Sequence, residues 1–164
     1  MFDSAGIQSL SEYGGIEGRN FFHACNKLEE SIADRLEESK ETNLLEVAVR
    51  VLADLARDHR NLYKLIYLSD YRSEKTFLEE WERYQTNKLI IKELTTRYKI
   101  DDRNVEGIFE RLSLLTHGIC TVIATTSMHY SNEQVVGIIN DALTDVIGNR
   151  MEDLKYEYKQ YSLH

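Results

Sequence analysis

Hydrophobic side chains recur every three or four residues along most of the chain, the spacing that places them on one face of an α-helix. The first such stripe consists of Phe21, Cys25, Leu28, Ile32 and Leu36. It predicts a helix that ends near Lys40, followed by a helix over residues 44–55, a short apolar helix within residues 61–70 and a long helix over residues 74–98. The pattern therefore predicts an all-α fold.

The polar segments between these stripes contain helix-capping residues. Asn43, with a glutamate three residues later, is expected to cap one helix, and Asp102 to cap the next long one. Ser131 and Gln134 form a capping box, so the last helix should start at Asn132. Six helices are predicted from residue 20 onwards, joined by short connections.

The stretch LLTHGICTVIATTSMHYSNEQ begins inside a predicted helix over residues 104–128. This helix has no charged side chain after Arg111, although a helix that faces water on one side shows charge there. We therefore expect its own domain to cover one side and a second copy of the chain to cover the other. Paired with the last helix, it predicts a homodimer through a four-helix bundle. The residues expected at the interface are Ile119, Val122, Ile123, Val135, Ile139, Leu143 and Val146.

The same uncharged run is long enough to cross a bilayer, which needs about 20 apolar residues. Its serines, threonines and histidine make it too polar for hydrocarbon, so we interpret it as a buried protein helix and expect no membrane partner.

The composition is that of a small globular protein. A chain of 164 residues with 42% hydrophobic and 29% charged side chains fits one folded domain, and the absence of proline favours helices over many short strands. The net charge of −8 disfavours attraction of the whole chain to nucleic acid or anionic lipid. Two cysteines and an N-terminus without a secretory pattern predict a cytoplasmic location.

Catalytic and metal-binding patterns are not evident in the sequence. His117 and Cys120 share a helix face, but a zinc site needs three or four ligands, and the more common role of such a pair is in a packed core. The chain contains no nucleophile elbow, no glycine-rich phosphate loop and no paired metal motif. We therefore expect no enzyme activity, no metal and no cofactor.

Aromatic residues gather on three successive predicted helices that should pack near one another. They either fill a core or line a gap in it that takes a small apolar or aromatic molecule, and both interpretations remain open. The residues expected to border such a site, in a cavity of a few hundred Å³, are Tyr67, Trp81, Tyr84, Phe109 and His117.

The last two predicted helices, with the sequence LSLLTHGICTVIATTSMHYSNEQVVGIINDALTDVI, resemble the dimerisation region of the TetR family of bacterial transcriptional regulators. The order and lengths of the helices over residues 43–158 are also similar to that family. The resemblance implies a helical domain, residues 42–164, that binds an effector and dimerises. It also implies that residues 1–41 are the remnant of a helix-turn-helix head with its connecting helix.

The N-terminal segment GGIEGRNFFHACNKLEESI resembles the family's recognition helix and the lysine-containing segment that follows it. This resemblance implies DNA contacts from Arg19, Asn20, His23 and Lys27. Only 13 residues precede Gly14, so we expect a truncated or degenerate head that lacks the bracing first helix. Residues 1–41 hold nine acidic and four basic side chains, a balance of −5, which predicts weak DNA binding.

Two functions from different classes follow. The first is a TetR-like regulator that senses a small molecule through its helical core. The alternative is a helical dimerisation module that binds no DNA and acts by pairing with a full-length relative.

Overall fold

The computed structural model describes residues 16–38, 43–68 and 84–161, and side chains for residues 21, 23–37, 43–68 and 84–148. The helices in these ranges are α2 (Ile16–Glu38), α3 (Leu44–Asp58), α4 (Arg60–Tyr67), α6 (Gln85–Thr96), α7 (Asp102–Thr125) and α8 (Asn132–Tyr161). No strand occurs within the described ranges, and the predicted all-α class is confirmed.

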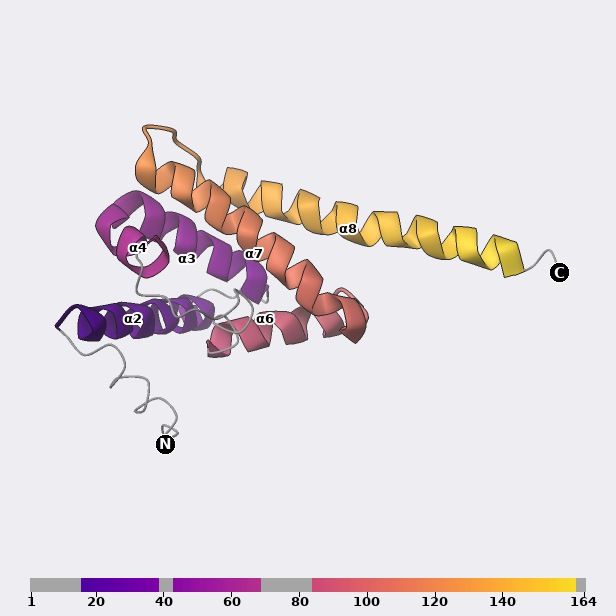
Figure 1. The fold of residues 1–164 in the computed structure, drawn as a ribbon, viewed down its shortest axis with the longest axis horizontal. Helices are drawn as coiled ribbons and strands as arrows, with labels where there is room; N and C mark the ends of the chain where they lie inside the picture. The colour runs from indigo at the N-terminus through magenta and orange to yellow at the C-terminus, as the bar shows by residue number, and fades with distance from the viewer. Residues whose placement is uncertain (1–15, 39–42, 69–83, 162–164) are drawn as a thin grey trace.

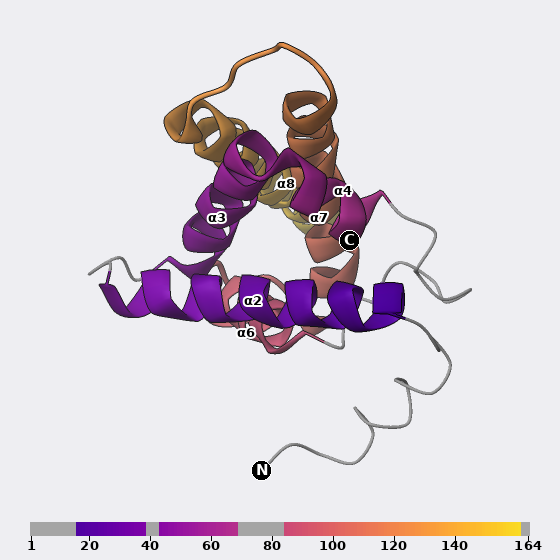
Figure 2. The same cartoon turned by 90° about the vertical axis from the view of Figure 1, so that its left-hand side faces the viewer.

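Helix α3 lies at the centre of the fold and contacts each of the other five helices. Helices α7 and α8 pack against each other and against α3, and α8 continues past the end of α7 (Figure 1). Helix α2 lies across the end of this assembly and contacts α3, α4 and α6 (Figure 2). Helices α2, α3, α4, α6 and α7 therefore surround a common interior.

One hydrophobic core joins all six helices. It extends from Phe21 and Ile32 on α2, through Val47 and Leu94, to Val135 on α8. The predicted boundary between residues 41 and 42 therefore does not separate two cores in the described structure, since α2 packs on the same interior as the later helices.

Two of the predicted helix starts are confirmed. The side chain of Asn43 accepts a hydrogen bond from the backbone N–H of Glu46 at the start of α3. At the start of α8, Gln134 N–H donates to Ser131 Oγ and Ser131 N–H donates to Gln134 Oε1, the reciprocal bonds of a capping box. Both signals could be read from sequence because donor and acceptor lie three residues apart.

Two other starts differ from the prediction. Asp101, not Asp102, caps α7 by accepting from the backbone N–H of Arg103 at 2.9 Å. The predicted continuous helix over residues 74–98 is wrong at Tyr84, which is extended (φ −87°, ψ 128°), so α6 starts at Gln85. Lys99 then takes the left-handed conformation (φ 57°) just beyond α6.

Candidate functional site

A cavity of about 50 Å³ lies between α2, α3, α4, α6 and α7. We call it the central cavity. Four of the five residues predicted to bind a ligand line it, namely Tyr67, Tyr84, Phe109 and His117. Trp81 lies outside the described residues. The predicted volume of a few hundred Å³ is wrong for this conformation, in which aliphatic side chains such as Leu52 and Ile90 also line the cavity.

The buried polar side chains of the described structure converge on this cavity. Thr86, Asn87, Ser113 and Thr116 are its four buried polar residues, with exposures of 3–9%, and all four line the central cavity. Thr116 satisfies its hydroxyl locally by donating to the backbone oxygen of Leu112 at 2.8 Å. The side-chain hydroxyls of Ser113 and Thr86 form no hydrogen bond with another residue that the structure describes. These two side chains therefore place hydroxyl groups in the cavity wall that a ligand could contact.

A tyrosine fixes the position of His117 at the cavity wall. The ring of Tyr63 is fully buried, and its hydroxyl donates to the backbone oxygen of His117 at 3.1 Å. The same hydroxyl lies 3.3 Å from both His117 Nδ1 and Thr121 Oγ1. The ring of Tyr67 packs on the imidazole with centroids 4.3 Å apart. These contacts hold the imidazole in one orientation beside the cavity.

Among the described residues that line the cavity, Glu29 is the one acidic side chain, and none is a lysine or arginine. It extends from α2, and its Oε2 accepts from the backbone N–H of Thr86 at 3.1 Å. This bond satisfies a free N–H in the first turn of α6. The contact joins residues 57 positions apart, which explains why the sequence did not reveal where α6 starts.

The pair considered for metal binding does not form a site. Cys120 has no exposed surface, and burial raises the pKa of its thiol to about 12, so the thiolate that binds metals is disfavoured at neutral pH. Among the described residues there is no group of three or more histidine, cysteine, aspartate or glutamate side chains placed to hold an ion.

The predicted dimer residues fall into two groups. Ile119, Val122 and Val146 are partly exposed. The other four are buried within the protomer, with exposures of 0–2%, and so form part of its own core; they are Ile123, Val135, Ile139 and Leu143. They belong to the core stripe of each helix, which looks the same in sequence as an interface stripe.

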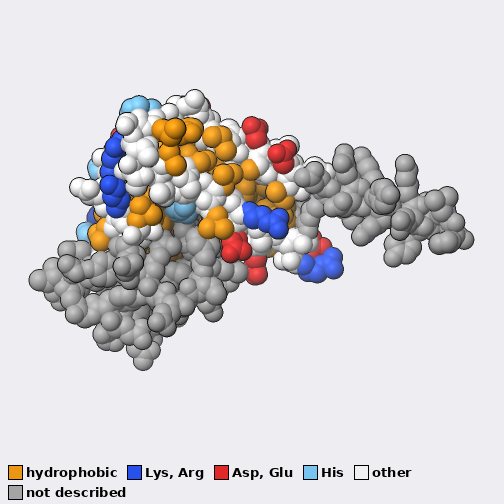
Figure 3. Space-filling model, turned by 45° about the horizontal axis from the view of Figure 1, so that its top comes forward, with side chains coloured by type: hydrophobic (Ala, Val, Ile, Leu, Met, Phe, Trp, Pro, Cys, Tyr) orange, Lys and Arg blue, Asp and Glu red, His pale blue; other side chains and the backbone are white. Residues whose placement is uncertain are grey.

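An exposed apolar surface nevertheless covers the outer side of α7 and α8, and sequence analysis did not assign its largest members. Leu114, Leu115 and Ile138 are 52%, 37% and 37% exposed. Figure 3 shows hydrophobic side chains gathered on one face of the molecule. We call this surface the outer α7–α8 face; it consists of Leu114, Leu115, Gly118, Ile119, Val122, Ile138, Ala142 and Val146. A Cβ added at Gly118 would meet no atom within 4 Å.

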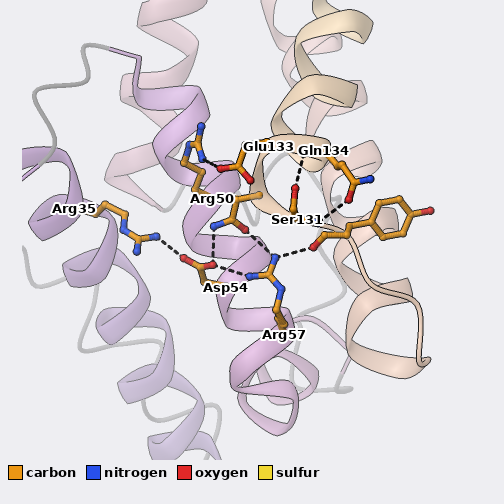
Figure 4. Close-up of polar contacts among 9 residues, drawn as sticks. Arg35, Arg50, Asp54, Arg57, Ser131, Glu133 and Gln134 are labelled. Atoms are coloured by element: carbon orange, nitrogen blue, oxygen red, sulfur yellow. Dashed lines mark hydrogen bonds and ion pairs between the residues drawn. The ribbon is translucent and has the colours of Figure 1, made fainter.

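A polar network that the sequence did not predict joins α2, α3 and the start of α8 (Figure 4). Asp54 accepts hydrogen bonds from Arg35 on α2, from Arg57 on its own helix and from Asn132 Nδ2. Arg57 also donates to the backbone oxygen of Tyr130 and to Asn132 Oδ1, both at 2.9 Å. Partial burial by itself would raise the pKa of Asp54, but the hydrogen bonds and the charge of Arg35 outweigh it and leave the pKa below 3.8.

The predicted DNA-binding residues lie on one uninterrupted helix. Helix α2 runs for 23 residues through the segment that resembles a recognition helix and through the lysine-containing segment, with no turn between them. Arg19 and Asn20 are on its first two turns, and their side chains lie outside the described part. His23 and Lys27 are exposed, and Lys27 forms an ion pair with Glu30 at 3.2 Å.

The chain matches no protein-family model, and searches of curated proteins and of solved structures found no match. Helix α7 is long and apolar enough to cross a membrane by length and composition. A core helix gives the same signal, and α7 packs against α3, α4, α6 and α8.

Proposed function

We propose that this chain is a TetR-like, dimeric regulator that senses a small molecule in the central cavity. The observation that carries the proposal is the convergence of all four buried polar residues of the described structure on one gap in an otherwise apolar interior. A core that served only for stability would be expected to surround such a gap with apolar side chains. A binding site needs a few polar groups in an apolar cavity to orient its ligand.

The cavity of about 50 Å³ would be the closed state of this sensor. Ligand sites usually measure roughly 300–1,000 Å³, so an effector must bind an expanded conformation. Leu28 is a lining side chain that is only partly buried, so its displacement would cost less packing than that of a buried lining residue such as Ile90. A ligand that binds only the expanded state shifts the population toward it.

Dimerisation through the outer α7–α8 face is the second part of the proposal. Large apolar side chains are exposed on two adjacent helices, and hydrophobic side chains gathered on one face are typical of protein interaction sites. Two copies would pair these helices into the four-helix bundle of a two-fold dimer. Helix α2, which lies on the central cavity and bonds to α3 through Arg35, would transmit the change in shape.

A thermal-shift screen of compact apolar and aromatic compounds tests the sensing role. A ligand that binds only the folded state raises the melting temperature by mass action. A hit should lose its effect in Ser113→Val, which fills the gap and removes the hydroxyl, and should keep it in Ser127→Val, an exposed position in the α7–α8 loop. A screen without any concentration-dependent shift would contradict the proposal.

The alternative, a dimerisation module without DNA binding, is favoured by one feature of the N-terminal region. Helix α2 runs without a break from Ile16 through the lysine-containing segment, and residues 1–41 carry a net charge of −5. Fluorescence anisotropy at low salt, with DNA taken from upstream of the coding sequence, separates the two roles. Sequence-specific binding below micromolar concentration would support the regulator. The absence of such binding would support the dimerisation module without DNA binding.

A further inference from the structure

The charge of the central cavity indicates which class of small molecule it would take; this inference rests on the function proposed above. Glu29 contributes one carboxylate to the lining, and none of the described lining residues is a lysine or arginine that would balance it. Glu29 is partly buried, and a negative charge at such a site attracts a cation and repels an anion more strongly than one in bulk water. A carboxylic acid effector would therefore be disfavoured.

The carboxylate of Glu29 can accept a hydrogen bond from a ligand through its Oε1 atom. Its Oε2 accepts from the backbone N–H of Thr86, which holds the group at the α6 end of the cavity. No hydrogen bond or ion pair to Glu29 Oε1 is found within the described chain. The neighbouring cation on α2, Lys27, is paired with Glu30 and lines a different groove. The carboxylate is thus fixed in position but keeps an acceptor for a ligand.

The remaining lining suits the same ligand. A primary ammonium group has three N–H donors and no acceptor. Glu29 would accept a hydrogen bond from one ammonium N–H. The hydroxyl oxygens of Ser113 and Thr86, which accept no hydrogen bond from another described residue, could accept from the other N–H donors. Tyr67 and Tyr84 add aromatic faces, which attract cations.

We propose that the central cavity binds a small apolar amine, whose ammonium group is held by Glu29 and the cavity hydroxyls, in preference to a neutral or acidic molecule of the same shape. Lys27 and Glu30, the charged residues nearest to Glu29 in sequence, do not line the central cavity and would not contact the ammonium group.

Isothermal titration of the full chain with benzylamine, benzyl alcohol and benzoate tests this preference. At pH 8 a primary alkylamine is charged, a carboxylic acid is ionised and an alcohol is neutral, so the three ligands differ in charge at similar shape. Benzylamine should bind tightest and benzoate weakest. In Glu29→Gln, whose amide oxygen can still accept from Thr86, benzylamine should bind roughly tenfold to a hundredfold more weakly, because a charge-assisted hydrogen bond is lost. Benzyl alcohol should bind as before.

Glu30→Gln is the matched control, since it removes the same charge from an adjacent, exposed position of α2. It should leave all three affinities unchanged. Benzyl alcohol or benzoate binding as tightly as benzylamine would overturn the inference while small-molecule sensing stands. If Glu29→Gln does not fold, the order of the three ligands on the wild-type chain decides alone. If benzylamine does not bind, the inference is wrong, and the compound screen then decides separately whether sensing also fails.

Discussion

At the scale of single residues, the reliable signals are those whose partners are close in sequence. Ser131 and Gln134 exchange two hydrogen bonds across three residues, and the start of α8 follows from them. The sequence could not distinguish Asp101 from Asp102 as the cap of α7, because the two adjacent aspartates have the same side chain. In the structure the backbone angles place Asp101 at the cap. The buried hydroxyl of Ser113 also had a signal, since residues 113, 116 and 117 share a helix face with i, i+3, i+4 spacing.

Replacing Ser131 with alanine should lower the free energy of unfolding by about 1 kcal/mol, the usual cost of losing an N-cap. The backbone N–H of Gln134 would lose its acceptor, which lies 3.3 Å away. Urea denaturation followed by circular dichroism measures the change. Ser127→Ala, in the exposed loop before α8, should leave the midpoint within experimental error. Equal effects of the two substitutions would show that the capping box contributes nothing specific.

At the scale of elements, the sequence predicted where helices occur but not which contacts between them fix their ends. The stripes of α2, α3, α7 and α8 were clear because each helix has one buried face. The start of α6 depends on Glu29, 57 residues away, and the join between α3 and α8 depends on Asp54, Arg57 and Asn132. No local periodicity encodes such pairs, so the polar contacts that hold the helices together required the structure.

The Asp54 network should make the stability of the protein depend on pH. Because the pKa of Asp54 is lower in the folded chain than in the unfolded one, its contribution is complete above about pH 5, well above the unfolded pKa, and is lost as the pH falls through the folded-state pKa. Asp54→Asn should lower the free energy of unfolding at pH 7 by about 1 kcal/mol, a value discounted for solvent screening. The difference from wild type should shrink between pH 5 and pH 2.

Asp58→Asn is a suitable control, since Asp58 is exposed on the same helix and forms no ion pair with another described residue. Urea titrations at several pH values compare the three proteins. A gap between wild type and Asp54→Asn that stays constant down to pH 2 would mean that the charge of Asp54 does not stabilise the fold.

At the scale of the whole molecule, a core stripe and an interface stripe cannot be separated by sequence alone. The seven residues predicted for the dimer include four that the protomer buries for itself, whereas Leu114, Leu115 and Ile138 carry the exposed surface. Both groups are equally hydrophobic in sequence. The cavity residues were easier to predict, because four of the five chosen aromatic and histidine side chains do converge, although the gap between them is smaller than expected.

Ile138→Asp should abolish dimerisation without unfolding the protomer. Ile138 is 37% exposed, so an aspartate there is solvated in the monomer but buried without a partner in the proposed dimer. The dimer dissociation constant should rise by at least about a hundredfold, equivalent to roughly 2.7 kcal/mol. Sedimentation velocity measures it, with Leu89→Asp as the matched control because Leu89 is 42% exposed on α6. A wild-type chain that sediments as a monomer at micromolar concentration would refute the dimer.

Entry of a small molecule into the central cavity is the central claim, and methyl NMR of isoleucine-labelled protein tests it most directly. Ile32, Ile66 and Ile90 line the cavity, whereas Ile119 and Ile138 lie on the outer α7–α8 face. Titration with benzylamine, or with a hit from the compound screen, should shift the three cavity methyl signals in a saturable manner and move the two outer signals much less. Shifts confined to Ile119 and Ile138, or no saturable shift at any isoleucine, would contradict the account.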